Sequence, residues 1–335
     1  MVVPVYGGEK HLMQVVEEIA TLTDPTATPD GNSFRVAELV LVHDCGPDDS
    51  ARVIRRAAEK WGWVRPIWLS RNFGQHPATL AGMASTGGEW IVTLDEDGQH
   101  DPHDIGRLLD AALRDNASLV YADPVNEAPH SAFRRLTSVG AKRAGALLSG
   151  GTDTSAFHSF RLVLGEVGRS VAAYAGQGVY LDVALSWVAS PPATAPVTLR
   201  DEGDRVSGYN LRRLLSHFWR MVLTSGTRGL RVVSVLGVLS ALVGFVLAAV
   251  LVVLRIVNGS DVQGWTSMIV VTLVCSGAIL FALGVVAEYI GVAVGMAMGK
   301  PPYLIVSDPE AGPLRRGRGR DGGRGGGRGG GRDGD

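Results

Sequence analysis

The sequence predicts an α/β protein with a doubly wound, mostly parallel sheet, followed by an amphipathic interfacial helix and a hairpin of two transmembrane helices. Two observations predict the sheet: short apolar runs alternate with segments of helical periodicity, and short loops join them. A third observation predicts the hairpin, because residues 232–257 and 265–291 are long enough and apolar enough to cross a bilayer.

The elements of the predicted sheet follow one another through the first part of the chain. Apolar runs predict strands at residues 2–6, 39–42, 66–69, 91–94 and 119–122. Apolar side chains at helical spacing predict helices at residues 10–23, 51–61, 77–85 and 105–115. In a sheet of this type, ligands bind beyond the carboxyl ends of the strands, so we expect the site in the loops that follow them.

Polar residues stand at the carboxyl ends of four predicted strands. They are Tyr6 and Gly7, His43 and Asp44, Ser70 with Arg71 and Asn72, and Asp95, Glu96 and Asp97. Because parallel strands end at the same edge of a sheet, we expect these residues to share one rim. Each of these residues could instead have an ordinary structural role: Asp44 as a turn residue or helix cap, and Arg71 as a surface cation.

The acidic loop after residues 91–94 is the most informative stretch of the chain. Asp95, Asp97 and Gln99 place two carboxylates and an amide oxygen at alternate positions directly after an apolar strand. Mg²⁺ and Mn²⁺ take oxygen ligands and often share them with substrate phosphates, so this loop suits a nucleotide diphosphate. A solvated acidic turn is the alternative interpretation.

Charged residues are distributed unevenly, although the formal net charge is only -1. Arg255 is the one charged residue in 232–257. Basic residues such as Arg228 and Arg231 precede this segment and Lys300 follows the second one, whereas the connecting residues 258–264 include Asp261 and no basic residue. This asymmetry predicts that both termini are cytoplasmic. Two buried helices of a large soluble core are the alternative.

These patterns divide the chain into six parts. They are a cytoplasmic domain at 1–209, an amphipathic interfacial region at 210–231, transmembrane helices at 232–257 and 265–291, a cytoplasmic segment at 292–314, and a disordered Gly/Arg tail at 315–335. A core helix is the alternative for 210–231. For the tail, contact with anionic lipid or no specific function is favoured over binding of nucleic acid.

Several short motifs occur in a fixed order along the chain. They are Val2-Val3-Pro4-Val5-Tyr6, the loop with Asp44 and Asp48, Arg71-Asn72-Phe73-Gly74, Gly88-Glu89-Trp90, Asp95-x-Asp97-x-Gln99, Ser159-Phe160-Arg161-Leu162, Ser207-Gly208-Tyr209 and Lys300-Pro301-Pro302-Tyr303. With the two apolar segments, this series resembles the membrane-anchored family 2 glycosyltransferases that load a sugar from a nucleotide donor onto a polyprenyl phosphate. Dolichyl-phosphate mannose synthases and bacterial undecaprenyl-phosphate glycosyltransferases are members. The resemblance extends from Met1 to about Val306 and implies a GT-A fold for the domain.

The resemblance implies roles for particular residues. Those implied in binding the substrates are Pro4, Tyr6, Glu9, Asp44, Asp48, Arg71, Asn72, Gly74, Asp95, Glu96, Arg200, Arg205, Ser207 and Tyr209. Asp95, Asp97 and Gln99 would hold an Mg²⁺ or Mn²⁺ ion that bridges the donor diphosphate, which gives Asp97 a catalytic part. Arg161, together with Arg200 and Arg205, would neutralise phosphates.

The chain departs from many members of the family at the residue before Phe160. Those members have an Asp that is proposed as the base, whereas this chain has Ser159, with Asp153 as the nearby carboxylate that could substitute. A sugar hydroxyl must lose a proton as it attacks. A phosphate monoester, with a second pKa near 6, is already mostly dianionic at about pH 7. Ser159 therefore favours a lipid phosphate as the acceptor.

The sequence thus predicts an inverting, metal-dependent transfer of a sugar from a UDP- or GDP-linked donor to a polyprenyl phosphate at the cytoplasmic membrane face. The partners would be the nucleotide sugar, the lipid acceptor and the membrane, and a homo-oligomer is compatible with this interpretation. Two alternatives stay open: a membrane glycosyltransferase of the same fold that acts on a glycan or protein hydroxyl, and a non-catalytic membrane scaffold. The nucleotide base is left open by His43 and Gly7, where the family has an acidic residue and Asn.

Overall fold

The computed structural model describes residues 1–126, 157–176, 178–189, 191–200, 228–258 and 265–311. Its centre is a mixed, mostly parallel sheet with the strand order β10-β5-β4-β1-β6-β8-β7-β9. The strands are β1 (Val2–Val5), β4 (Leu39–His43), β5 (Val64–Leu69), β6 (Trp90–Thr93), β7 (Leu119–Pro124), β8 (Arg161–Leu164), β9 (Ala193–Val197) and β10 (Ile305–Val306). The predicted alternation of strands and helices is therefore confirmed for the sheet.

The direction of the strands places the site. β1 pairs in parallel with both β4 and β6, and β4 pairs in parallel with β5. The chain builds outward from β1 on one side through β4 and β5, and then crosses to the other side at β6. Such a switch of strand order opens a crevice beyond the carboxyl ends of the strands on either side of it. β8 and β10 run antiparallel to their neighbours β6 and β5.

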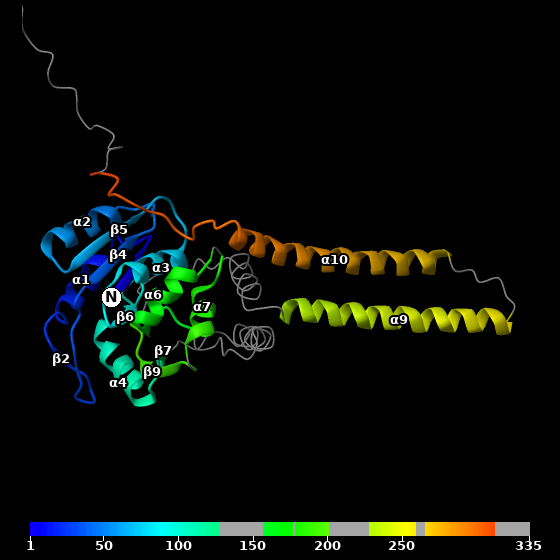
Figure 1. Cartoon of the computed structure of the whole chain (residues 1–335), viewed down its shortest axis with the longest axis horizontal. Coiled ribbons are helices and arrows are strands. Elements are labelled where there is room, and N and C mark those ends of the chain that lie inside the picture. The colour runs from blue at the N-terminus through cyan, green and yellow to red at the C-terminus, as the bar shows by residue number, and fades with distance from the viewer. Residues whose placement is uncertain (127–156, 177, 190, 201–227, 259–264, 312–335) are drawn as a thin grey trace, which may run out of the picture.

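Helices cover both faces of the sheet (Figure 1). α1 (Leu12–Ala20), α2 (Ser50–Lys60) and α4 (Ile105–Asp115) pack on one face, and α3 (Gln75–Ser85), α6 (Gly165–Tyr174) and α7 (Leu181–Val188) pack on the other. Smaller elements are a hairpin of β2 (Thr26–Ala27) and β3 (Ser33–Phe34) and a 3₁₀ turn at Pro102–Asp104.

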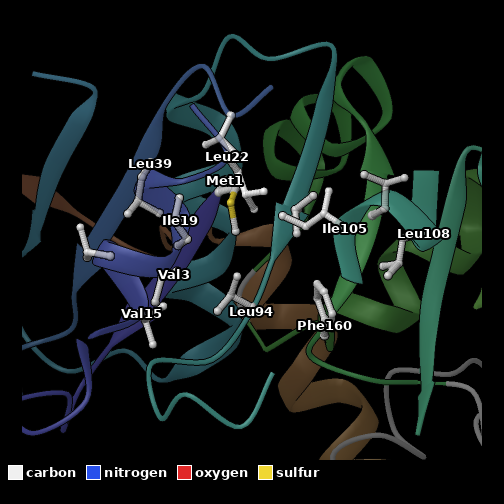
Figure 2. Close-up of a cluster of buried hydrophobic side chains, with 14 of the residues drawn as sticks. Met1, Val3, Val15, Ile19, Leu22, Leu39, Leu94, Ile105, Leu108 and Phe160 are labelled. Atoms are coloured by element: carbon white, nitrogen blue, oxygen red, sulfur yellow. The ribbon is translucent and has the colours of Figure 1, made fainter. Parts of the chain in front are cut away.

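The core is divided by the sheet into two hydrophobic layers. Val3 and Val5 of β1 point into the layer under α1 and α2, part of which is drawn in Figure 2, whereas Val2 points into the opposite layer under α3. The same alternation separates Leu41 from Val42 in β4. Strands buried on both faces are apolar at nearly every position, which is why these runs could be recognised in the sequence.

Two long helices extend from the domain as a pair (Figure 1). They are α9 (Arg228–Asn258) and α10 (Trp265–Ala297). Among the described residues, one stretch, Val274–Gly295 in α10, is long and apolar enough to span a membrane, and the apolar stretch Val233–Val246 in α9 is shorter. The expected pair of transmembrane helices therefore stays a prediction. Most of the expected interfacial region at 210–231 and the tail at 315–335 lie outside the described residues.

After α10 the chain returns to the domain. Ile305 and Val306 form β10 on the outer edge of β5, and Ser70 N donates to Leu304 O at 3.0 Å. Residues 301–311 thus connect the last helix to the edge of the sheet; we refer to them as the strap. The sequence predicted only a cytoplasmic segment here, because a strand of two residues has no detectable periodicity.

Candidate active site

The loops that follow β1, β4, β5 and β6 are held together by carboxylates that accept hydrogen bonds from backbone amides. Glu96 accepts from Tyr6 N at 2.6 Å and from Gly7 N at 2.8 Å. Asp44 accepts from Phe73 N at 2.7 Å and from Gly74 N at 2.8 Å. The four loops of the expected rim are therefore joined in two pairs: Glu96 joins the loops after β1 and β6, and Asp44 joins those after β4 and β5.

Burial perturbs both of these carboxyl groups. Asp44 is only 3% exposed, and burial raises its pKa while the two amide donors act in the opposite direction. Burial likewise raises the pKa of Glu96 to about 7, against the amides of Gly7 and Tyr6. With both oxygens of each carboxylate occupied by loop backbone, Asp44 and Glu96 shape the rim.

The first loop also contacts the loop after β4 at two further points. Asp48 accepts from Glu9 N at 2.9 Å, and Glu9 in turn accepts from Asp49 N at 3.3 Å. Partial burial raises the pKa of Asp48, but the hydrogen bonds from Glu9 N and Ser50 outweigh it and leave the pKa lowered. The loops approach so closely that a Cβ at Gly46 would lie 1.7 Å from the carbonyl oxygen of Tyr6. Only glycine fits at that position.

The acidic loop lies beside this rim. Asp95 accepts from Gln75 Nε2 at 2.6 Å through Oδ1, and from Ser159 Oγ at 2.6 Å through Oδ2. Burial raises the pKa of Asp95, the Ser159 hydroxyl lowers it, and the nearby charge of Asp97 raises it again. Asp97 and Gln99 are half-buried, and Gln99 N donates to Asp97 Oδ1 at 3.2 Å. The negative charges of Asp95 and Asp97 therefore lie close enough to repel each other.

Arg161 is the first residue of β8, and Ser159 lies two residues before it. Thr93 Oγ1 donates to the carbonyl of Ser159 at 2.6 Å, which fixes the backbone next to the acidic loop. Arg161 is 3% exposed, and its guanidinium forms a buried ion pair with Asp182 of α7, which also accepts from Tyr121 OH at 2.9 Å. The resemblance implied that Arg161 neutralises phosphates, but its positive charge is already neutralised by Asp182 in the core. Because Arg161 is buried, we expect any effect of this residue on a ligand to be transmitted through neighbouring residues.

The remaining residues implied in binding are distributed around the loops. Arg200 N donates to Gln99 O at 2.9 Å, and the Arg200 guanidinium binds Glu18 at 2.7 Å and Asp101 at 3.0 Å. Tyr6 is 48% exposed. Four other residues are found as follows: Pro4 is half-buried in β1, Arg71 Cζ lies 4.5 Å from the Phe73 ring centroid, Asn72 is exposed, and Gly74 directly precedes α3 with φ 96°. Asp153, Arg205, Ser207 and Tyr209 lie outside the described residues.

Sequence reasoning missed two residues of this network. Gln75 is the first residue of α3, two positions before the predicted helix, and a single Gln has no pattern that marks it. Asp182 lies beyond the predicted strands and helices, so no signal connected it with Arg161. The one sequence signal that could have indicated Gln75 is Gly74, which follows a strand and its loop and could mark the start of a helix at the next residue.

The side chains of the acidic loop suit a divalent cation only in part. Among the described residues, no group of three or more His, Cys, Asp and Glu side chains is arranged to hold a metal. Asp95, Asp97 and Gln99 can supply two carboxylates and one amide oxygen, and Mg²⁺ commonly takes one or two carboxylates together with substrate phosphates. A cation would also relieve the repulsion by which Asp97 raises the pKa of Asp95. The residues therefore fit a metal that the donor diphosphate helps to bind.

A separate cavity of about 780 Å³ lies at the opposite edge of the sheet. Met1, Glu38 and Trp90, at the amino ends of β1, β4 and β6, are among its lining residues. It faces away from the carboxyl-end rim, so it is distinct from the candidate site.

Comparison with known proteins identifies relatives over almost the whole chain. The family model described as Glycosyl transferase family 2 matches residues 1–166. The undecaprenyl-phosphate 4-deoxy-4-formamido-L-arabinose transferase of Klebsiella pneumoniae (strain 342) is 29% identical, with 91% of each chain covered. The protein of that name from Pseudomonas aeruginosa (strain LESB58) is 28% identical over 91% of this chain and 88% of its own. The uncharacterized glycosyltransferase YkcC of Bacillus subtilis is 29% identical over 91% and 92%.

Solved structures show a weaker likeness. Glucosyl-3-phosphoglycerate synthase from Mycobacterium tuberculosis, in complex with Mn²⁺, uridine-diphosphate-glucose and glycerol 3-phosphate, is 17% identical with a TM-score of 0.43, covering 68% of this chain and 78% of that chain. Mannosyl-3-phosphoglycerate synthase from Rubrobacter xylanophilus is 12% identical with a TM-score of 0.46, covering 69% and 72%. At these scores the likeness carries no conclusion about ligands.

Proposed function

Residues 1–166 belong to glycosyl transferase family 2, and from this membership we propose that the enzyme transfers a sugar from a UDP- or GDP-linked donor to a polyprenyl phosphate at the cytoplasmic membrane face, with inversion. The relatives from Klebsiella pneumoniae and Pseudomonas aeruginosa, which match nearly the full chain, support the acceptor, since they are named as undecaprenyl-phosphate sugar transferases. Transfer of a glycosyl group to a lipid phosphate is the part of the proposal that these relatives support most directly.

The observation that carries the choice of acceptor is the contact between Ser159 and Asp95. The Ser159 hydroxyl donates to the Asp95 carboxylate at 2.6 Å, so the residue that precedes Phe160 orients a carboxylate. A hydroxyl acceptor would require a base at the point of attack. A lipid phosphate brings its own charged oxygen, because its second pKa is about 6. The protein then has to position the two substrates.

The rim provides a place for the nucleotide. Glu96 and Asp44 hold the loops after β1 and β5, and Tyr6 at the edge of this rim is 48% exposed. We assign the base and ribose to these loops, and the diphosphate to Asp95, Asp97 and Gln99 with a bound Mg²⁺ or Mn²⁺. The cation would supply positive charge for the departing nucleotide diphosphate.

The position of α10 supports action at a membrane. Its segment Val274–Gly295 is long and apolar enough to span a bilayer. The strap that follows α10 pairs with β5, whose carboxyl end leads into the rim loop Arg71-Asn72-Phe73-Gly74. A lipid phosphate held at the bilayer surface could thus reach the donor. Basic residues on both sides of the two apolar segments support cytoplasmic termini.

The test is a transfer assay with membranes that contain the full chain. Labelled UDP- and GDP-sugars are supplied one at a time with undecaprenyl phosphate and Mg²⁺ or Mn²⁺, and the label is followed into the organic-soluble lipid fraction. We expect one donor of the panel to label the lipid, with the sugar linked through an inverted anomeric centre. Label that enters a polymer or a protein, and not the lipid, would contradict the proposed acceptor.

A further inference from the structure

The Asp95 carboxylate is held at both of its oxygens by neutral side chains. Gln75 Nε2 donates to Oδ1 and Ser159 Oγ donates to Oδ2, each at 2.6 Å. The group cannot rotate about its Cβ–Cγ bond without breaking one of the two hydrogen bonds. Each oxygen keeps a second lone pair, so the carboxylate can still bind a cation.

The neutrality of the two donors bears on metal binding. An Arg or Lys partner would also orient a carboxylate, but its positive charge would repel a cation and weaken the negative charge that attracts one. An amide and a hydroxyl fix the direction of the oxygens and leave the charge in place. This is the arrangement expected around a metal-binding carboxylate, whose ligand atoms are usually oriented by hydrogen bonds from surrounding groups.

Each donor has its own attachment to the fold. Gln75 begins α3 directly after Gly74, whose φ of 96° sets the turn and whose amide is bound by Asp44. Ser159 is fixed by the hydrogen bond from Thr93 Oγ1 to its carbonyl, and the pairing of Thr93 with Arg161 continues this contact into the sheet. Gln75 follows β5 and Ser159 precedes β8, and these two strands lie on opposite sides of β6, the strand that leads into Asp95.

The start of α7 supports the neighbours of both donors. The Tyr180 ring lies with its centroid 4.0 Å from that of His76, the residue after Gln75. Asp182 forms the buried ion pair with Arg161, two residues after Ser159. Hence Tyr180, just before α7, and Asp182, near its start, each contact a residue within two positions of one of the donors.

We propose that Gln75 and Ser159 are positioning residues that orient Asp95 for a divalent cation bound together with the donor diphosphate. The inference rests on the proposed function for the donor, and it adds Gln75 to the site and gives Ser159 a role other than that of a base. Groups that orient metal ligands typically change metal affinity by 10–100-fold when they are removed.

The test measures Mn²⁺ binding by electron paramagnetic resonance on the purified full chain in detergent, with UDP and then GDP present. Gln75→Met keeps the length of the side chain and removes the donor, and Ser159→Ala removes the hydroxyl. We expect each change to weaken Mn²⁺ binding by about 10-fold or more. Ser159→Thr keeps the hydroxyl and should restore binding to near the wild-type level.

Matched controls are available in the chain. Gln14→Met removes an exposed Gln whose Nε2 donates to Glu18 at 3.0 Å, and Ser85→Ala removes a hydroxyl that donates to Ala81 O at 2.7 Å. Neither should change Mn²⁺ binding. In the transfer assay, Gln75→Met should raise KM for the donor and leave KM for the lipid unchanged, a separation that general loss of structure would not produce.

The outcomes distinguish this inference from the proposed function. Wild-type Mn²⁺ affinity in both Gln75→Met and Ser159→Ala would overturn the positioning roles and leave lipid transfer untouched. Because Gln75 is exposed, its variant tests the inference even if Ser159→Ala fails to fold. If the wild-type chain binds no Mn²⁺ with either nucleotide, both this inference and the metal part of the proposed function are wrong.

Discussion

Arg55 of α2 binds both carboxylate oxygens of Asp308, which follows β10 in the strap. Nε lies 2.8 Å from Oδ2 and one terminal nitrogen lies 2.7 Å from Oδ1. The two residues are separated by 253 positions in the sequence. Arg55 also stacks over Trp68 of β5, with 4.7 Å from Cζ to the ring centroid. This forked ion pair therefore fixes the end of the strap to the domain after the chain has passed through α10.

Loss of this ion pair should loosen the strap. Asp308→Asn is expected to lower the free energy of unfolding by about 1 kcal/mol, since the pair is partly buried and bidentate. It should also speed hydrogen exchange at the Ser70 amide, which donates to Leu304 O. Exchange measured by mass spectrometry checks this. Glu310→Gln, which alters a far more exposed partner of Arg55, serves as the control with a smaller effect.

The same contact should depend on pH. The hydrogen bond from Arg55 holds the pKa of Asp308 below its ordinary value of 3.8. The stabilisation by ionised Asp308 is thus complete above about pH 4 and is lost as the pH falls through the lower folded-state pKa. The protection factor of the Ser70 amide, which corrects for the intrinsic pH dependence of exchange, should fall over this acidic range in the wild type and lose that dependence in Asp308→Asn. An identical profile in both proteins would contradict the assignment.

Removal of Asp97 should abolish transfer without unfolding the protein. Asp97→Ala takes away a half-buried carboxylate of the acidic loop, so a bound cation would lose a ligand and a charge. We expect lipid labelling to fall by about 100-fold or more, because a group that stabilises charge in the transition state is lost. Circular dichroism and membrane association should be unchanged. Asp115→Ala, an exposed Asp at the end of α4, is the control.

A chelator should reproduce the effect of Asp97→Ala reversibly. Addition of EDTA to wild-type membranes is expected to stop lipid labelling, and excess Mg²⁺ or Mn²⁺ should restore it, because the proposed cation would supply positive charge to the leaving diphosphate. Full activity in EDTA would show that the acidic loop acts without a metal.

The buried pair of Arg161 and Asp182 should be costly to break. Asp182→Asn leaves a 3% exposed guanidinium without its counter-charge and is expected to cost about 3–5 kcal/mol of unfolding free energy, measured by chemical denaturation. Replacing both residues by apolar ones, Arg161→Met with Asp182→Leu, should recover much of the loss because no charge is then left buried. A double variant as unstable as the single one would mean that packing dominates at this position.

Local patterns were sufficient for much of the sheet and its helices. The predicted helix at 105–115 coincides with α4 at Ile105–Asp115, and the predicted strand at 39–42 differs from β4 at Leu39–His43 by one residue. Helix α3 begins at Gln75 and not at residue 77, since the turn at Gly74 and its bond to Asp44 set the start. β10 could not be predicted from local patterns, because it forms only by pairing with β5, which lies far away in the chain.

By itself, the sequence determined the alternation of strands and helices, the location of the acidic loop and the presence of two long apolar segments, because each depends on residues that are neighbours in the chain. Only the tertiary structure decided which carboxylate has which partner. Asp44 and Glu96 bind loop amides, Asp95 is oriented by Gln75 and Ser159, and Arg161 is neutralised by Asp182. Hydrogen bonds and ion pairs require atoms to lie within about 3 Å, and for side chains as distant in sequence as Ser159 and Asp95 that proximity is set by how the sheet and its helices pack.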